Sequence, residues 1–187
     1  MKRKFSGRAV ITFCLIIFGI WLYLQYIHNG TSNRDVPLPD SLHPAVSHNA
    51  ELLIQQSAGK GIEIIITDGF RSHQEQDRLY EKGRSTQGNI VTHAKGGESF
   101  HNFGLAIDFA IKANGQAIWD MGYDGNGNGQ SDWMEVVEIA KELGFEWGGD
   151  WKHFKDYPHL QMDFGLSIND LQKGERPPSQ PMTVKSS

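Results

Sequence analysis

The sequence contains very little cysteine and has no excess of positive charge. Its single cysteine, Cys14, excludes an intramolecular disulfide and a cysteine-rich zinc module. The formal net charge is −4, from 18 Lys and Arg residues against 22 Asp and Glu residues. This balance argues against a nucleic-acid partner, because nucleic-acid-binding domains usually carry a basic stripe. Any metal ion would therefore be held by histidine and carboxylate side chains. A length of 187 residues favours one domain.

The one long apolar run lies near the N-terminus, at residues 9–27. A membrane-spanning helix needs about 20 such residues, so the run is just long enough. Four cations precede it: Lys2, Arg3, Lys4 and Arg8. Cations on this side place the N-terminus in the cytoplasm and the rest of the chain outside. Residues 1–27 are therefore expected to form a signal anchor with a transmembrane helix, with a cleaved signal peptide as the alternative. The protein is expected at the cell membrane with its domain facing the cell wall, or secreted after cleavage.

Composition divides the rest of the chain into three parts. Residues 28–40 are polar and contain Pro37 and Pro39, which predicts an extended linker. Residues 41–165 carry the apolar periodicity of a folded domain. Residues 166–187 include several prolines and end in serines, which predicts a disordered tail.

Within the domain, local signals predict several elements. A helix is expected to begin at Pro44 and to end before Gly61, and a β-branched strand follows at residues 62–67. Ser72 and Glu75 have the spacing of a capping box, so a second helix begins at His73. Residues 84–98 are polar and glycine-containing and read as a long loop, which is often functional. A further helix is expected at residues 136–143.

The chemistry is expected to lie in two short motifs. His101 and Asp108 are separated by Gly104 and an apolar run, and His159 follows Asp156 at the third position. Two imidazoles and one carboxylate form a three-ligand set with an open fourth position, which is typical of catalytic zinc. A carboxylate within an apolar strand is costly unless it is paired or coordinated. An ion pair between Asp108 and an arginine is the alternative reading of this residue. Asp156 would be the general base.

Other candidate site residues surround these motifs. Arg71 lies in the predicted turn between a strand and a helix, where functional side chains are often presented; a surface arginine is the alternative. His93 is interpreted as a loop histidine. Trp147 and Trp151 could line a cleft or complete the core.

Residues 124–135 match a calcium-binding loop pattern at every stated position. The six oxygen ligands would come from Asp124, Asn126, Asn128, the Gln130 carbonyl, Asp132 and Glu135. The preceding sequence does not look helical, so a helix–loop–helix pair is not expected. The alternative is a turn rich in Asn and Gly, with Asp132 as the N-cap of the next helix and Glu135 as its capping-box partner.

Taken together, these motifs resemble the zinc L-alanyl-D-glutamate peptidases of peptidase family M15, which also contains D-alanyl-D-alanine carboxypeptidases and dipeptidases. The resemblance covers roughly residues 37–162. It rests on His101, Asp108 and His159 in their motifs and on four further segments: residues 69–72, 76–80, 83–84 and 147–151.

The resemblance implies an α+β fold, in which a small antiparallel sheet with flanking helices cradles the zinc site. Carried over by position, His101, Asp108 and His159 would be zinc ligands, and Asp156 and Arg71 would be catalytic. Ser99, Arg71 and Trp147 are the expected substrate-binding residues.

The implied activity is hydrolysis of the L-alanyl-D-glutamate bond in peptidoglycan stem peptides, by a monomer that acts in bacterial cell-wall turnover. Zinc would be the cofactor and calcium a second candidate ion. Two alternatives stay open. One is a D-alanyl-D-alanine carboxypeptidase or dipeptidase of the same group, and the other is a non-catalytic zinc-binding module of the cell wall.

Overall fold

The computed structural model describes residues 17–23 and 36–178, and the chain divides into two units, residues 1–36 and 37–187. In the first unit, residues 17–23 are helical. No helix among the described residues is long and apolar enough to cross a membrane. The expected N-terminal transmembrane helix is therefore wrong: the described helical stretch, residues 17–23, rises about 10 Å against a hydrocarbon core of about 30 Å. The rest of the predicted segment lies outside the described residues.

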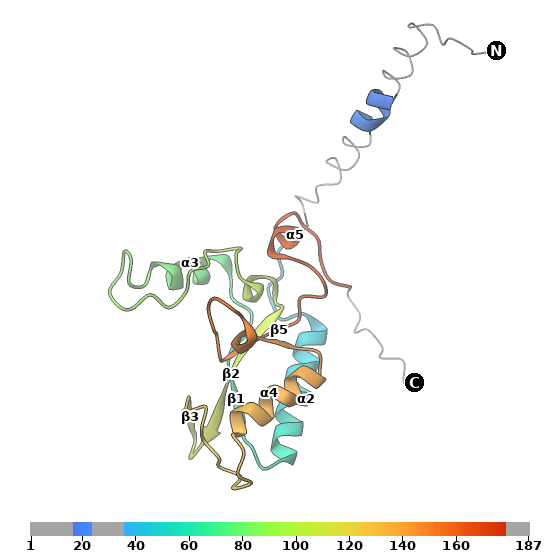
Figure 1. Ribbon diagram of the computed structural model, residues 1–187. Coiled ribbons are helices and arrows are strands. Elements are labelled where there is room, and N and C mark those ends of the chain that lie inside the picture. The colour runs from blue at the N-terminus through green and yellow to red at the C-terminus, as the bar shows by residue number, and fades with distance from the viewer. Residues whose placement is uncertain (1–16, 24–35, 179–187) are drawn as a thin grey trace, which may run out of the picture. The chain divides into compact units, whose positions relative to one another are not determined.

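The second unit is built on a five-stranded sheet in which every pair is antiparallel (Figure 1). The strands are β1 (Ile64–Asp68), β2 (Ala106–Ala113), β3 (Gln116–Ile118), β4 (Glu146–Trp147) and β5 (His159–Gln161). Four of them run in the order β1-β2-β5-β4, and β3 pairs with the far end of β2. The longest strand, β2, is therefore the centre of the sheet.

Two helices, α2 (Pro44–Gly59) and α4 (Asp132–Glu142), pack on each other and on the sheet. As predicted, α2 begins at a proline, whose missing N–H would be unpaired at that position in any case. The core between helices and sheet contains Leu53, Phe109 and Trp133, each at most 1% exposed. The fold is α+β with an antiparallel sheet, as expected.

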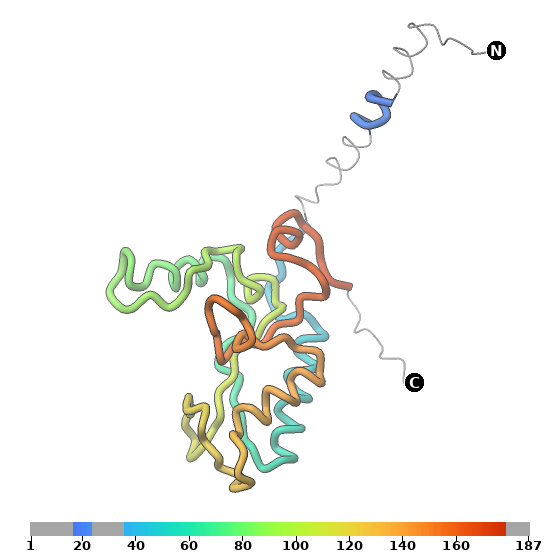
Figure 2. The backbone as a smooth tube through the Cα atoms, in the orientation of Figure 1, coloured from blue at the N-terminus to red at the C-terminus, as the bar shows by residue number. Residues whose placement is uncertain are grey.

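Helix α3 (His73–Glu81) extends away from the sheet and continues into the loop at residues 84–98; Figure 2 shows this arm in green. The predicted capping box is present, because Ser72 and Glu75 each bond the other's backbone N–H. Among its residues only Gln76 is buried. Helix α3 therefore forms one wall of a surface cleft and is not a layer of the core.

Short elements went unpredicted because each is too brief to show a sequence period. They are β3, β4 and two 3-10 helices, η1 (Phe100–Phe103) and η2 (Gly148–Asp150). Helix α4 begins four residues earlier than predicted. Its N-cap is Ser131, whose hydroxyl accepts from the Met134 N–H, so the reading of Asp132 as N-cap is wrong.

The expected disordered tail contains a short helix, α5 (Ile168–Gln172). Ser167 and Asp170 form its capping box, and Leu171 is 1% exposed within the core. The Gln172 side chain donates to the Gly97 carbonyl at 2.9 Å, which ties α5 to the loop of the arm. Residues 166–178 therefore differ from the prediction, while residues 179–187 lie outside the described part.

Because Leu171 is fully buried, we expect Leu171→Ala to lower the free energy of unfolding by about 2–5 kcal/mol, through lost transfer energy and a residual cavity. Leu38→Ala, at a residue that is 52% exposed, is the matched control and should change it by less than about 0.5 kcal/mol. Urea denaturation of both variants measures the difference. Equal, small effects would mean that α5 does not belong to the folded unit.

Candidate metal centre and active site

Asp108 lies at the centre of the sheet, on β2. Its neighbours Ile107 and Phe109 are fully buried, so the strand itself is part of the core. The strand register sets Asp108 directly opposite His159 on β5. On the other side, a register shift in β1 brings Asp68 opposite Asp108. Directly opposed residues in antiparallel strands have Cβ atoms about 4.5–5.5 Å apart, so the sheet itself holds the carboxylate beside one imidazole.

His101 reaches the same point from η1. Ser99 caps this short helix, and the helix ends at Gly104, whose positive φ of 69° and close approach to the Ser41 carbonyl leave no room for a Cβ. His101 is 3% exposed, and its Nδ1 lies 2.7 Å from the Gly69 carbonyl. A carbonyl can only accept, so Nδ1 carries the proton and Nε2 keeps a free lone pair.

In His159 the hydrogen-bonded nitrogen is Nε2, whereas in His101 it is Nδ1. Its Nε2 lies 3.1 Å from Oε1 of Gln161, which leaves Nδ1 as the free lone pair. Gln161 in turn donates from Nε2 to a carboxylate oxygen of Glu146 at 3.1 Å. This orientation of the Gln161 amide assigns Oε1 as the acceptor for His159. A chain of three side chains from β4 and β5 therefore sets which nitrogen His159 presents.

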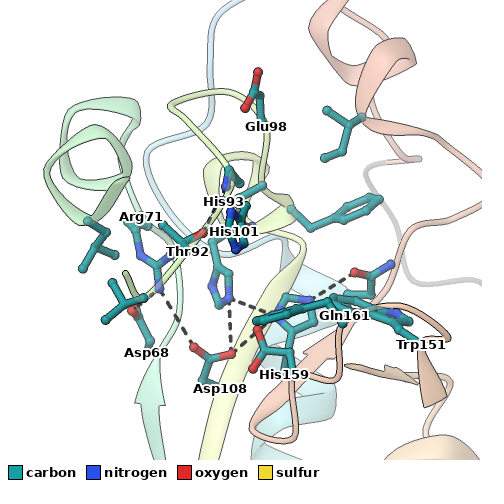
Figure 3. A pocket seen from close by; sticks show the side chains of 18 residues that line it. Asp68, Arg71, Thr92, His93, Glu98, His101, Asp108, Trp151, His159 and Gln161 are labelled. Carbon is teal, nitrogen blue, oxygen red and sulfur yellow. Dashed lines mark hydrogen bonds and ion pairs between the residues drawn. The ribbon is translucent and has the colours of Figure 1, made fainter. Parts of the chain in front are cut away.

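The three groups form a small triangle (Figure 3). His101 Nε2 lies 3.2 Å from His159 Nδ1, and these two nitrogens lie 3.3 and 3.4 Å from Oδ1 of Asp108. Donors bound tetrahedrally to one zinc ion at 2.0–2.1 Å would be about 3.3 Å apart. Asp108 Oδ1 is buried and has no hydrogen-bond partner among the described residues. The triangle therefore fits a metal ion, and both imidazoles present an unprotonated nitrogen to it.

The electrostatics of Asp108 agree with this geometry. Burial alone would raise the pKa of its carboxyl group, but hydrogen bonds and positive charge from His101 and His159, which act when these imidazoles are protonated and no ion is bound, outweigh burial and hold that pKa well below its ordinary value. The carboxylate is therefore ionised, as a metal ligand must be.

Arg71 lies beside the triangle without belonging to it. Its guanidinium bonds Asp68 and, at 2.8 Å, Oε1 of Gln76, and Nη2 lies 3.9 Å from Oδ2 of Asp108. The alternative reading, an Arg71–Asp108 ion pair, thus describes only the outer oxygen of Asp108. Its inner oxygen, Oδ1, faces His101 and His159. Arg71 is a held cation at the edge of the site instead of a free surface arginine.

Asp156 lines the same cleft as the triangle. Its backbone pairs with Gly148 and His159, which fixes the loop that carries it. Burial raises the pKa of the Asp156 carboxyl group above its ordinary value; the charge of His159 opposes this shift, and Asp108 adds to it. A raised pKa makes a carboxyl group a better proton acceptor, which suits it to taking up and returning a proton.

The cleft above the triangle has a volume of about 690 Å³. One wall comes from the arm, with Val91 and His93, and the other from the loop after η2, with Trp151 and Phe154. The rings of His93 and Phe154 meet edge-on with centroids 6.2 Å apart, and Trp151 tilts against His159 at 5.1 Å. The cleft therefore has apolar walls above a polar floor.

The remaining expected substrate-binding residues are placed differently. Ser99 lines the cleft. Trp147 is 6% exposed, donates from Nε1 to the Tyr157 carbonyl and is not among the residues that line the cleft. Trp151 occupies the cleft wall instead.

The sequence motifs did not identify the residues that orient the site side chains or line the cleft above them. Gln161 could have been found, because residues two apart on a strand share a face and Gln161 follows His159 by two. Gln76 is one helical turn beyond the Ser72 cap, and its full burial has no local signal. Phe154 and Thr92 come from loops whose approach depends on the whole fold.

The residues of the candidate calcium loop lie between β3 and the first turn of α4, in a separate part of the unit. Among the described residues, the group of three or more His, Cys, Asp or Glu side chains that could hold a metal is the triangle of His101, Asp108 and His159. The three carboxylates of the loop are not brought together in this way.

Comparisons with known proteins agree with this site geometry. A family model described as D-alanyl-D-alanine carboxypeptidase matches residues 92–162. The peptidoglycan L-alanyl-D-glutamate endopeptidase CwlK of Bacillus subtilis (strain 168) is 60% identical over 161 residues, which cover 83% of this chain and 96% of CwlK. The L-alanyl-D-glutamate peptidase of Listeria phage A118 is 34% identical over 126 residues, 67% of this chain and 40% of the phage protein.

A solved structure shares the fold. DacB from Streptococcus pneumoniae D39 superposes with a TM-score of 0.50 at 19% identity, over 79% of this chain and 82% of that chain. The identity to CwlK, together with the fold and the His-Asp-His group, places the chain in a class of peptidases. The chain belongs to peptidase family M15, as its motifs indicated.

The hydrogen bonds from His159 to Gln161 and from Gln161 to Glu146 can be tested by substitution. Replacing Gln161 by Leu removes the acceptor for the His159 Nε2–H, and we expect affinity for a titrated divalent ion such as Zn²⁺ to fall about 10- to 100-fold. Glu146→Gln keeps an acceptor for Gln161 and should leave the affinity close to that of the unchanged protein. Competition with a chromophoric chelator measures both. Unchanged affinity in Gln161→Leu would rule out this orienting role.

Proposed function

We propose that the protein is a zinc-dependent peptidase that hydrolyses the L-alanyl-D-glutamate bond of peptidoglycan stem peptides. The observation that carries the proposal is the triangle of two unprotonated imidazole nitrogens and one carboxylate oxygen at the floor of the cleft. Choice of the bond is supported by the 60% identity to CwlK, whose name states that activity. The substrate lies in the bacterial cell wall, so we propose that the unit from residue 37 onward works there.

His101, Asp108 and His159 would hold the zinc ion, because their donor atoms are free of protons and spaced for it. When bound, zinc supplies Lewis-acid chemistry, polarising a carbonyl and lowering the pKa of water. No thiol competes in the folded unit, since the single cysteine precedes it.

Asp156 is proposed to move the proton. It lines the cleft beside the triangle, and burial raises the pKa of its carboxyl group. It would take a proton from the attacking water and return it to the leaving amine, which are the two halves of general acid–base catalysis.

Arg71 is proposed to offset the negative charge that develops on the carbonyl oxygen of the scissile bond. Its guanidinium is held by Asp68 and Gln76, so little reorganisation is needed when the charge appears. Ser99, Trp151 and Phe154 line the cleft and would bind the peptide on either side. The apolar rings exclude water from the reacting bond, which strengthens each electrostatic contact.

Digestion of muropeptides tests the bond. The zinc-loaded full chain should release fragments with a new N-terminal D-glutamate, identified by mass spectrometry, and a chelator should stop their release. The family model described as D-alanyl-D-alanine carboxypeptidase makes release of free D-alanine the competing outcome. Release of D-alanine alone would reject the proposed bond and keep the peptidase, whereas no release by a zinc-loaded chain would favour a binding module.

Separate substitutions distinguish metal binding from proton transfer. Asp156→Asn should keep bound zinc but reduce turnover about 10²- to 10⁴-fold, because only the proton acceptor is lost. His159→Ala should lose zinc, because it removes one of three ligands. Asp150→Asn, at an exposed carboxylate that pairs with Lys141, is the control. Metal analysis and turnover are measured on each; normal turnover in Asp156→Asn would remove its proposed role.

A further inference from the structure

The loop between β3 and α4 gathers oxygen atoms that the proposed peptidase chemistry does not use. Its residues follow the spacing D-x-N-x-N-G-x5-E from position 124 to position 135. This pattern places oxygen donors at alternate positions and a glycine at the sharp turn.

The backbone of the loop wraps around its first side chain. Both carboxylate oxygens of Asp124 accept from the backbone, one from the Asn128 N–H at 3.1 Å and the other from the Gly129 N–H at 2.9 Å. Gly129 has a positive φ of 83°, which glycine adopts at no steric cost. The loop thus closes on itself within six residues, as a cation-binding turn must.

The later side chains converge on one carboxylate. Nδ2 of Asn126 and Nδ2 of Asn128 lie 3.0 and 2.8 Å from the same oxygen of Glu135. Glu135 comes from the first turn of α4 and is 5% exposed. The amide oxygens of Asn126 and Asn128 accept from the backbone N–H groups of Asn128 and Gln130, at 3.0 and 2.8 Å. Both side chains would therefore have to turn before they present an oxygen toward an ion beside Glu135.

One buried carboxylate oxygen within the loop lacks a hydrogen-bond partner in the part of the chain that the structure describes. Asp132 is 2% exposed, and its Oδ2 accepts from the Gly125 N–H of the loop at 3.0 Å. Its Oδ1 is buried and has no hydrogen-bond partner among the described residues. An unpaired carboxylate oxygen in such a place is costly and calls for an ion or a water molecule.

The net negative charge of the loop also favours binding of a divalent cation. Asp124, Asp132 and Glu135 contribute three negative charges, and the nearby ammonium group is that of Lys60, 3.4 Å from Glu135. Three carboxylates against one ammonium leave a local charge of −2. The donors are all oxygens, which suit calcium, and no imidazole or thiol of the loop would favour zinc.

We propose that residues 124–135 bind one calcium ion. Its ligands would be side-chain oxygens of Asp124, Asn126, Asn128 and Glu135, the Gln130 carbonyl, and Asp132 directly or through water. The amides of Asn126 and Asn128 turn their oxygens toward the ion, which takes over from Lys60 as the partner of Glu135. Position 9 of such loops often acts through water, which explains why the three carboxylates need not converge.

The role of this site would be structural. The Asp132 N–H donates to the Tyr123 carbonyl, and Glu135 lies in the first turn of α4. A bound ion would therefore fasten the β3–α4 connection to α4, in place of the contacts that Asn126 and Glu135 make with Lys60 at the end of α2. The inference does not depend on the peptide bond that is cleaved.

Equilibrium dialysis of the full chain against CaCl₂ tests the site. We expect one saturable site with a dissociation constant of about 0.1–1 mM, the range of extracellular calcium modules. At 10 mM calcium the unfolding equilibrium constant should then fall by about 10- to 100-fold. Magnesium at the same concentration should stabilise less, because it demands a tighter octahedral site.

Two variants and a control make the result specific. Asp124→Asn and Glu135→Gln should each weaken calcium binding about tenfold or more, because each removes a charged ligand. Asp124 is exposed, so its substitution leaves the core intact, whereas Glu135 is buried. Glu138→Gln, at an exposed carboxylate on the same helix, should bind calcium normally. No saturable binding below 10 mM, equal stabilisation by magnesium, or unchanged binding in both variants would overturn the proposal.

Discussion

The position of Asp108 constrains the rest of the unit. A carboxylate on the central strand of an apolar sheet would cost several kcal/mol if it stood alone, and here its flanking residues Ile107 and Phe109 are fully buried. A metal ion held between Oδ1 and the two imidazole nitrogens that converge on it, at 3.3 and 3.4 Å, would offset that cost. Sheet register supplies one of them and η1 supplies the other. The strand therefore keeps its charged residue only in a fold that also brings His101 and His159 to it.

The groups that hydrogen-bond the two imidazoles explain why each imidazole presents one defined nitrogen to the triangle. The Gly69 carbonyl selects the nitrogen that His101 presents, and Gln161 does so for His159. These two groups lie on different segments, and neither touches the other histidine. Loss of either would leave an imidazole free to expose its protonated nitrogen to the triangle, which is why the orienting contacts matter as much as the donor atoms.

Local signals in the sequence were sufficient for some of these features and not for others. The capping box of Ser72 and the ligand motif were readable because neighbours along the chain create them. The pairing of Asp108 with His159 joins residues far apart, and only register sets it. Composition predicts a tail that includes Leu171, yet the burial of this side chain depends on a surface made by other elements. The transmembrane prediction is wrong among the described residues, because hydropathy counts apolar residues, whereas the described helical stretch at residues 17–23 is too short to cross a membrane.

The length of β2 separates the two candidate metal sites and so separates their roles. Residues 106–108 pair with β5 at the triangle, whereas residues 111–113 pair with β3, which leads into the loop at 124–135. Five residues of strand from position 108 to position 113 span about 17 Å, so Asp108 lies well away from the end of β2 that pairs with β3. An ion in the loop could act on the chemistry through α4, because the ring of Trp133 packs against that of Phe109, next to Asp108, with centroids 4.6 Å apart. Stability and turnover are then expected to respond mainly to different ions, because the proposed zinc ligand Asp108 lies near the beginning of β2, whereas the end of β2 pairs with the strand that leads into the loop.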